Sequence, residues 1–325
     1  MEKTGSRGIG VKGEPVRVVF CGTPDFAVPT LLALHERGVH LVQVVTQPDR
    51  PRGRGQKPAP SPVKTAADRL GLSVLQPHRI RDPEVVRHLA SPAAHALVLV
   101  AYGQILPKGL LDAFPFGALN VHPSLLPKYR GAAPIQRAIL HGDTETGVSI
   151  MLMDEGMDTG PILAVERVPI KAHDTFGTLH DTLARVGADL LCRTFQAWVQ
   201  GRCHAVAQDN SQTILAPPIQ KHELHVNWQE PAAAVCCRIR AFDPWPGAFG
   251  FHGSKRIKFF HARLSTYTAQ GRPGEFLGLC RDGLIVCAGD GTSVAVGRLQ
   301  VEGRRPVSAD AFLRGYDLPI GSTFA

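Results

Sequence analysis

Apolar segments of strand length alternate with amphipathic segments of helical spacing over the first part of the chain. The first apolar segment ends at Gly22, and the helical pattern that follows it ends at Gly38. Strands that alternate with helices predict a mostly parallel sheet covered on both faces, an α/β architecture of the Rossmann-like kind. The predicted strands occupy 17–21, 41–46, 74–76, 96–101 and 118–122, and the predicted helices occupy 27–37, 64–70, 84–89 and 134–141.

The chain changes character after Gly201. Before that point the pattern predicts two further strands, 148–153 and 162–165, and a long helix, 174–199, with Asp174 as its N-cap. Beyond it helical periodicity becomes scarce and short strands alternate with turns, which favours a small β-barrel. We therefore expect a disordered leader, 1–15, an α/β domain, 16–201, a linker, 202–222, and a β-barrel domain, 223–325.

Charge and cysteine content narrow the class of protein. The 325 residues carry a formal charge of +8, which favours a polyanionic partner, although many soluble enzymes are moderately basic without binding one. The seven cysteines include no C-x-x-C pair, which argues against a disulfide framework and a zinc ribbon. No apolar run approaches about 18 residues, and the leader lacks the apolar core of a secretory signal. We expect a soluble, cytoplasmic protein with no membrane partner.

Motifs for common cofactors fail their tests. The turn after the first strand, 22–27, does not match G-x-G-x-x-G, and no G-x-x-x-x-G-K-[ST] occurs. The sequence therefore lacks the usual motifs for binding NAD or ATP. His222 and His225 are one residue closer than in H-E-x-x-H, which gives the wrong helical spacing for a zinc site. A linker or surface turn explains these histidines better, and we expect no metal.

Three polar residues indicate an acyl-transfer site. Asn120 and His122 are two apart at the end of a predicted strand, so their side chains point the same way at the edge where such sheets bind ligands. Both can donate to a developing oxyanion, while Asp158 could hold the tautomer of His122 and accept protons. Taken alone, Asp158 would be a turn cap. No serine or cysteine nucleophile with a base-bearing motif accompanies the three, so the attacking group is expected to belong to the substrate.

Two other segments have features found in nucleic-acid-binding proteins. The segment 47–57 follows the second strand and carries four cations separated by Pro and Gly: Arg50, Arg52, Arg54 and Lys57. It is expected to be a mobile loop above the same sheet edge and a natural partner for phosphates, although composition alone favours a solvated loop. Aromatic residues in 242–251 could stack on bases, but core packing is favoured.

Several motifs in order resemble those of the folate-dependent formyltransferases, and in particular of the members that act on methionyl-tRNA. The resemblance runs from about Arg17 to Tyr316 and is carried by 22–27, 47–55, 101–103, 120–137, 154–161, 240–247 and 312–316. It implies 10-formyltetrahydrofolate as the formyl donor. It also implies catalytic roles for Asn120, His122 and Asp158, and folate binding by Ser124, Leu125, Leu126 and Pro127.

The same resemblance implies the other partner. The loop around 50–54 would engage the acceptor end of a tRNA, and the C-terminal barrel, similar to an OB fold, would hold the acceptor arm. Pro123 stands where some members have glycine, which removes no functional side chain. Leu215 and Pro218 stand where Tyr and Lys are common, which weakens the expectation of tRNA contacts from the linker.

We therefore expect a monomeric enzyme that transfers the formyl group of 10-formyltetrahydrofolate to the α-amine of methionyl-initiator tRNA. One alternative keeps the chemistry but changes the acceptor to a small amine, and the additional basic domain after Gly201 argues against it. Another alternative is an inactive RNA-binding relative. The presence of Asn120, His122 and Asp158 together argues against that one.

Overall fold

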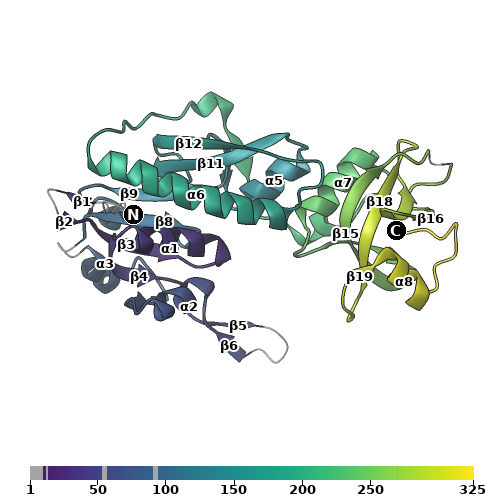
Figure 1. Ribbon diagram of the computed structural model, residues 1–325, viewed down its shortest axis with the longest axis horizontal. Coiled ribbons are helices and arrows are strands. Elements are labelled where there is room, and N and C mark those ends of the chain that lie inside the picture. Colours follow the sequence, from purple (N-terminus) through teal and green to yellow (C-terminus); the bar gives the residue numbers. More distant parts are fainter. Residues whose placement is uncertain (1–9, 12–13, 53–56, 91–93, 269) are drawn as a thin grey trace, which may run out of the picture. The chain divides into compact units, whose positions relative to one another are not determined.

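A computed structural model describes residues 10–11, 14–52, 57–90, 94–268 and 270–325. These residues form two compact units. The first unit comprises the described residues up to Gly131, together with 147–168 and 181–215, and the second comprises 132–146, 169–180 and the described residues of 216–325. The chain thus passes from one unit to the other more than once, and each unit is built from segments that are distant in the sequence (Figure 1).

The first unit is organised around a seven-stranded sheet with the order β12-β11-β9-β8-β3-β4-β7. β8 pairs in parallel with β3 and β9, and β4 pairs in parallel with β3 and β7, whereas β11 is antiparallel to β9. This arrangement confirms the predicted mostly parallel sheet. The strands are β3 (Arg17–Gly22), β4 (His40–Val45), β7 (Val74–Leu75), β8 (Ala96–Val100), β9 (Ala118–His122), β11 (Glu145–Leu152) and β12 (Ile162–Pro169).

Helices pack on both faces of this sheet. On one face Val19 packs in a cluster with Leu89 of α3 and Leu110 of α4. α6 lies on the opposite face, where a Cβ added to Gly187 would be only 2.7 Å from the Val121 side chain of β9 (Figure 1). The helices up to this point in the chain are η1 (Asp25–Ala27), α1 (Val28–Glu36), α2 (Pro62–Arg69), α3 (Pro83–Leu89), α4 (Lys108–Leu111), α5 (Pro134–Leu140) and α6 (Phe176–Val199).

The predicted N-cap of the long helix α6 is wrong. α6 begins at Phe176, and the Thr175 hydroxyl oxygen accepts a hydrogen bond from the backbone N–H of Thr178 at 3.3 Å. Asp174 lies one residue further out, where its carboxylate accepts a hydrogen bond from the Thr178 hydroxyl at 3.0 Å. A threonine hydroxyl reaches the first free N–H groups of a helix as well as a carboxylate does, so the Asp-Thr pair was ambiguous in the sequence.

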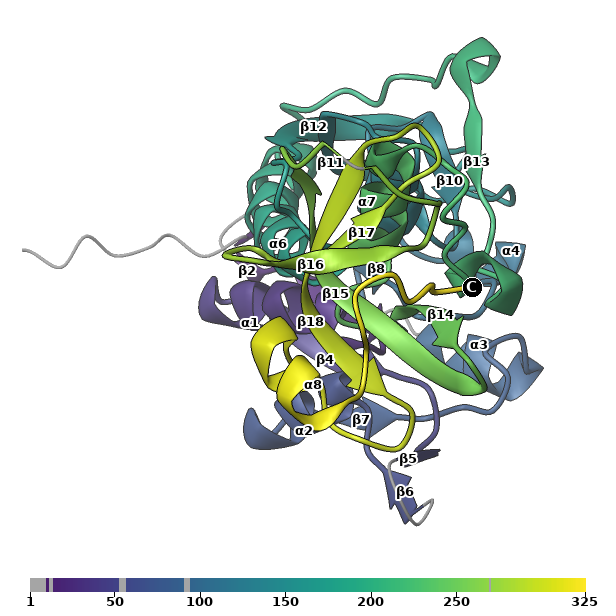
Figure 2. The same cartoon turned by 90° about the vertical axis from the view of Figure 1, so that its right-hand side faces the viewer.

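The second unit contains an antiparallel sheet of six strands, ordered β14-β15-β18-β17-β16 with β19 paired to β18 (Figure 2). It confirms that the C-terminal part is rich in antiparallel strands. The helix α8, however, was not predicted, because it spans only two turns. The elements are α7 (Ala232–Ala241), β14 (Ala248–His252), β15 (Lys255–Ser265), β16 (Phe276–Cys280), β17 (Gly283–Cys287), β18 (Ser293–Val301), β19 (Val307–Ser308) and α8 (Ala309–Gly315).

The aromatic segment 242–251 is divided between the interior and the surface. Phe242 is fully buried, as predicted for a core residue. The prediction of core packing is wrong for Trp245, whose side chain is 73% exposed, and Phe251 is also exposed. Phe249 is covered on one side by the Arg256 guanidinium, which lies 5.5 Å from the ring centroid.

The segment expected to be a linker has local structure. It contains η2 (Asn210–Gln212), β13 (Ile214–Ala216), which pairs with β10 (Lys128–Gly131), and η3 (Lys221–Leu224). Within the second unit, the Arg137 guanidinium contacts both carboxylate oxygens of Glu223 at 2.5 and 3.0 Å, and it donates to the Pro217 carbonyl at 3.2 Å. The hydrogen bond from Arg137 lowers the pKa of the Glu223 carboxyl. This glutamate therefore serves a structural ion pair in η3.

Three other sequence expectations concern sulfur, membranes and the leader. All seven cysteines are unpaired thiols, including the neighbours Cys236 and Cys237, which are buried on α7. Within the ranges that the structure describes, no helix is both long and apolar enough to cross a membrane. In the predicted leader, β1 (Gly10–Val11) pairs with β2 (Glu14–Pro15), and residues 1–9 lie outside the described part.

Candidate active site

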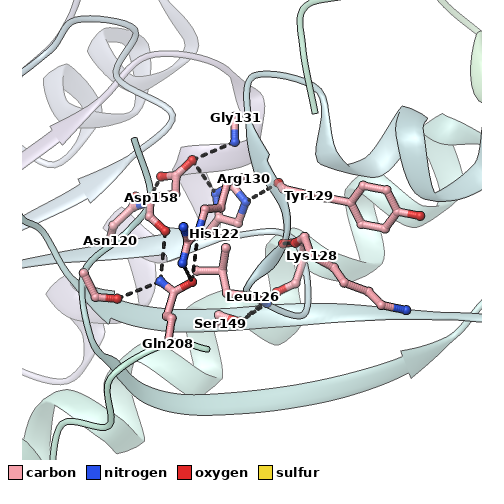
Figure 3. A network of polar contacts seen from close by, with 12 residues as sticks. Asn120, His122, Leu126, Lys128, Tyr129, Arg130, Gly131, Ser149, Asp158 and Gln208 are labelled. Atoms are coloured by element: carbon pink, nitrogen blue, oxygen red, sulfur yellow. Dashed lines mark hydrogen bonds and ion pairs between the residues drawn. The ribbon is translucent and has the colours of Figure 1, made fainter. Parts of the chain in front are cut away.

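Asn120 and His122 lie at the carboxyl end of β9, on the same face of the sheet. They are 5% and 4% exposed, so both side chains are almost fully withdrawn from water. Val121 between them points to the opposite face, toward α6. The period of two along a strand therefore places the amide and the imidazole side by side, as the sequence predicts (Figure 3).

Asp158 reaches the same point from the loop between β11 and β12. Its Oδ1 lies 3.5 Å from Asn120 Nδ2, and its Oδ2 lies 3.6 Å from His122 Nδ1. The backbone N–H of Gly131 donates a hydrogen bond to Oδ2 at 2.9 Å. Asp158 is one of the few non-glycine residues with a left-handed backbone, at φ 54°. One carboxylate thus faces both predicted partners, one oxygen toward each (Figure 3).

The second ring nitrogen of His122 is held by the main chain. Nε2 lies 2.9 Å from the backbone carbonyl oxygen of Tyr129. A carbonyl oxygen only accepts hydrogen bonds, so the contact places a proton on Nε2 and directs Nδ1 toward Asp158. The Tyr129 carbonyl, and not Asp158 as expected from the sequence, thereby sets the tautomer of His122. The Nδ1 edge is left for chemistry.

The contacts among the three side chains are longer than strong hydrogen bonds. Separations of 3.5 and 3.6 Å from Asp158 to Asn120 and His122 exceed the usual range, whereas the backbone contacts of Asp158 and His122 are both 2.9 Å. Catalytic groups often have this looser geometry without substrate and tighten around the reacting atoms. The site thus offers the Asn120 amide as a donor, the free Nδ1 edge of His122 and one carboxylate to a ligand.

The segment Ser124–Pro127 forms a firmly held turn beside this site. The Ser124 hydroxyl donates to the Lys128 carbonyl at 2.6 Å, and the hydroxyl of Ser149 donates to the Ser124 carbonyl at 2.7 Å. The Leu126 N–H donates to Ser149 Oγ at 3.1 Å. Ser124 and Leu126 are buried, and Leu125 and Pro127 are half-buried. The Ser124 hydroxyl is thus engaged within the turn. Leu125 and Pro127 are the side chains of this segment that are partly accessible to a ligand.

The basic segment begins as a hairpin. β5 (Arg50–Arg52) pairs antiparallel with β6 (Lys57–Ala59), so these flanks of the segment expected to be a mobile loop are paired strands. Arg50 is exposed and donates to Gln47 Oε1 at 3.4 Å. For Arg52 and Lys57 the structure describes the backbone only, and Arg54 lies outside the described residues.

Just before the hairpin, Asp49 accepts hydrogen bonds from Lys64 Nζ at 2.8 and 3.0 Å. These bonds, and a further one from Gln76, lower the pKa of the Asp49 carboxyl. Asp49, the acidic residue of the segment, is therefore already paired with Lys64 of α2. The exposed positive charge of Arg50 has no such carboxylate partner among its described contacts, which are those to Gln47.

A cavity of about 470 Å³ lies between this hairpin and the ends of β3 and β8. Gln47 and Tyr102 form part of its wall, and Gln47 Nε2 donates to the Tyr102 carbonyl at 3.3 Å. Burial raises the pKa of the Tyr102 hydroxyl. No local sequence pattern predicts this cavity, because its lining comes from four separate segments: Thr23, Pro24, Gln47, Pro48, Arg50, Ala59, Pro60, Ser61, Pro62, Ala101, Tyr102 and Gly103.

Two site residues were missed entirely by sequence reasoning. Gln208, in the segment expected to be a linker, donates through Nε2 to the backbone carbonyls of Asp158 and Gly160 at 2.9 and 2.7 Å. Its Oε1 accepts hydrogen bonds from Arg130 at 3.0 and 2.7 Å. No local sequence pattern indicates contacts between residues 48 to 78 positions apart, so only the three-dimensional structure reveals them. Across the part of the chain that the structure describes, no group of three His, Cys, Asp or Glu residues could hold a metal ion.

Comparison with known proteins assigns the class. The formyl transferase family matches residues 16–195, and its C-terminal domain matches residues 218–317. The chain belongs to the formyl transferase family. Its curated relatives include proteins named methionyl-tRNA formyltransferase, and that of Citrifermentans bemidjiense is 44% identical over 94% of this chain and 95% of its own length. That of Desulfotalea psychrophila is 45% identical over 92% of this chain and 93% of its own length.

Solved structures share the fold at low identity. The N-formyltransferase of Helicobacter canadensis, in complex with folinic acid and dTDP-3-aminofucose, aligns with a TM-score of 0.67 at 18% identity, over 86% of this chain and 98% of its own. The sugar 3N-formyl transferase WlaRD, solved with dTDP and 5-N-formyl-THF, aligns with a TM-score of 0.66 at 18% identity, over 90% of this chain and all of its own. These likenesses concern the fold.

Proposed function

We propose that this protein transfers the formyl group of 10-formyltetrahydrofolate to the α-amine of methionyl-initiator tRNA, giving N-formylmethionyl-tRNA for translation initiation. The observation that carries the proposal is the near full-length identity of 44% to a relative named for this acceptor. The convergence of Asn120, His122 and Asp158 at one strand end supplies the chemistry. Folate ligands in the related solved structures support the donor.

The reaction exchanges one C–N bond for another. The neutral amine of the methionyl ester attacks the formyl carbon, and a tetrahedral intermediate with a negative oxygen forms. The bond between the formyl carbon and N10 of the folate then breaks, and tetrahydrofolate leaves. The amine loses one proton and N10 gains one, so the overall reaction needs no oxidant and no metal. The protein has to stabilise the oxygen anion and carry the proton.

The site is suited to both tasks. Asn120 Nδ2 would donate to the oxyanion in a setting almost free of water. His122 Nδ1 would donate to it as well when the ring carries a second proton besides the one on Nε2. Asp158 would take the amine proton, directly or through water, and return a proton to N10. Because Nε2 of His122 is held by the Tyr129 carbonyl, the ring cannot turn its other edge to the substrate without losing that 2.9 Å hydrogen bond. Orientation is therefore fixed before the substrate arrives.

The remaining assignments complete the proposal. The turn Ser124, Leu125, Leu126 and Pro127 would contact the folate, chiefly through the half-buried Leu125 and Pro127 and the backbone. We place the catalytic domain at 16–201, a linker at 202–222 and a tRNA-binding domain at 223–325, in line with family matches to 16–195 and 218–317. The enzyme would act as a cytoplasmic monomer.

The direct test is incubation with methionyl-initiator tRNA and 10-formyltetrahydrofolate, followed by hydrolysis of the ester and detection of formylmethionine. The expected result is stoichiometric formylmethionine and tetrahydrofolate. A parallel reaction offers small amines, including amino sugars linked to nucleotides. Transfer to a small amine but not to charged tRNA would contradict the acceptor. RNA binding without any turnover would contradict the enzyme.

The basic segment 47–57 allows a separate test of whether this protein binds tRNA. Replacing Arg50, Arg52 and Arg54 with alanine should raise KM for the tRNA while folate binding survives. For each arginine that binds a phosphate in the unaltered protein, its removal should reduce the slope of log affinity against log salt by roughly one. The measurement is tRNA binding across a salt series.

A matched control removes three exposed arginines that lie on or after α6: Arg185, Arg193 and Arg202. This variant has the same net charge as the first, so it separates local binding from general attraction. Equal salt slopes for both variants and the unaltered protein would show that the segment does not touch phosphates.

A further inference from the structure

The orientation of the Gln208 amide follows from its partners. Arg130 has only donors, so the atom facing it must be Oε1, which accepts from Nε and Nη2 at 3.0 and 2.7 Å. The carbonyls of Asp158 and Gly160 only accept, so the atom facing them must be Nε2, at 2.9 and 2.7 Å. All four hydrogen bonds have good length, and the amide makes its full set at one place (Figure 3).

Arg130 connects the same amide to the turn that binds the Asp158 carboxylate. Its side chain is 5% exposed, and Nη2 also donates to Asn210 Oδ1 at 2.9 Å. The next residue, Gly131, donates its N–H to Asp158 Oδ2 at 2.9 Å. A buried guanidinium needs acceptors around it, and here two amide oxygens supply them. The arginine therefore fixes the position of Gln208 relative to the Gly131 N–H.

Asp158 is held at both ends in a backbone conformation that it would not favour by itself. Its φ of 54° lies in the left-handed region, where a residue with a Cβ is disfavoured and persists only if its surroundings fix it. Gln208 holds the carbonyl of Asp158, and Gly131 holds its carboxylate. If the carbonyl were released, rotation to a negative φ would turn the carboxylate away from Asn120 and His122.

We propose that Gln208 and Arg130 are positioning residues, which hold Asp158 in its left-handed conformation so that its carboxylate faces Asn120 and His122. The inference rests on the proposed function, in that Asp158 is taken as the proton carrier. It adds two supporting residues to the proposed catalytic residues Asn120, His122 and Asp158. The described side-chain hydrogen bonds of both residues are made to protein atoms.

Two replacements of Gln208 distinguish its role as an acceptor for Arg130 from its role as a donor to the backbone carbonyls. Gln208→Ala removes all four hydrogen bonds. Gln208→Glu keeps an acceptor for Arg130 but loses the donors to the carbonyls of Asp158 and Gly160. Both should slow single-turnover transfer by about 10–100-fold, as is usual for residues that orient a catalytic group, while KM for tRNA and folate changes less than about threefold. The matched control is Gln229→Glu, which changes an exposed glutamine of the second unit.

A double-mutant cycle decides whether Gln208 acts through Asp158. Single-turnover rates are measured for Gln208→Ala, Asp158→Ala and the double variant, with thermal unfolding recorded for each. Gln208→Ala should slow the unaltered enzyme but leave the Asp158→Ala rate unchanged. The same slowing in both backgrounds, or a lower Tm with an unchanged rate, would overturn the inference. A near-normal rate for Asp158→Ala would instead contradict the role of Asp158 itself, and with it any positioning of that residue.

Discussion

Alanine in place of His122 is expected to slow single-turnover formyl transfer by about 10²–10³-fold, the usual effect of losing one oxyanion donor. The ring is 4% exposed and its Nδ1 edge faces Asp158 at 3.6 Å, so alanine removes a buried polar group from the edge of the site where the reaction is proposed to occur. The rate should be followed by rapid quench with saturating 10-formyltetrahydrofolate and methionyl-tRNA. Binding of the folate should be nearly unchanged, because the ring is proposed to act on the transition state.

His35 provides the control for this experiment. It is an exposed histidine in the last turn of α1, and His35→Ala should transfer the formyl group at the normal rate. Asp158→Ala should be slowed as clearly as His122→Ala. If either of these two variants retained a near-normal single-turnover rate, the assignment of roles in the site would be wrong.

Gly160→Ala is expected to destabilise the protein by about 3 kcal/mol or more and to abolish most of the activity. A Cβ at this position would lie 1.9 Å from the backbone oxygen of Leu152, which is rigidly paired in the sheet. The chain between β11 and β12 would have to move, and with it Asp158 and the carbonyl that Gln208 holds. Thermal and urea unfolding, together with the transfer rate of the folded fraction, measure the two effects.

Gly109→Ala is the matched control for that substitution. Gly109 lies in α4, and a Cβ there meets nothing within 4 Å. Alanine is the better helix former, so the change should be neutral or stabilise the fold by up to about 1 kcal/mol. Equal stability of the two alanine variants would show that the close approach at Gly160 is relieved at little cost.

The parallel core of the fold could be predicted because its signal is local. Each buried strand is a short apolar run, each helix has its own amphipathic spacing, and the two alternate. The position of Asn120 and His122 followed in the same way, from alternation along a single strand and the rule that ligands bind at the carboxyl edge. The position of a side chain can therefore be predicted from sequence when it is set by a single strand or helix and the element next to it.

The incorrect or missing predictions concern features that are not set by a local sequence pattern. Core packing is predicted for Trp245 because aromatic side chains of small β-barrels are more often in the core, yet burial depends on which side of a turn faces the sheet. α8 was missed because a helix of 7 residues has too few turns for a periodic pattern. Gln208 was assigned to a linker because its partners, 48 to 78 residues away, are backbone carbonyls and one arginine. Such interactions leave no trace in local composition.

The left-handed turn at Asp158 and the bond from His122 to Tyr129 have a consequence for how related sites should be compared. Much of the machinery consists of main-chain atoms: the carbonyl oxygens of Tyr129, Asp158 and Gly160, and the amide hydrogen of Gly131. Evolution can therefore replace the side chain at 129 without altering the imidazole proton. Two enzymes could therefore hold the imidazole in the same way while an alignment of their sequences showed different residues at position 129.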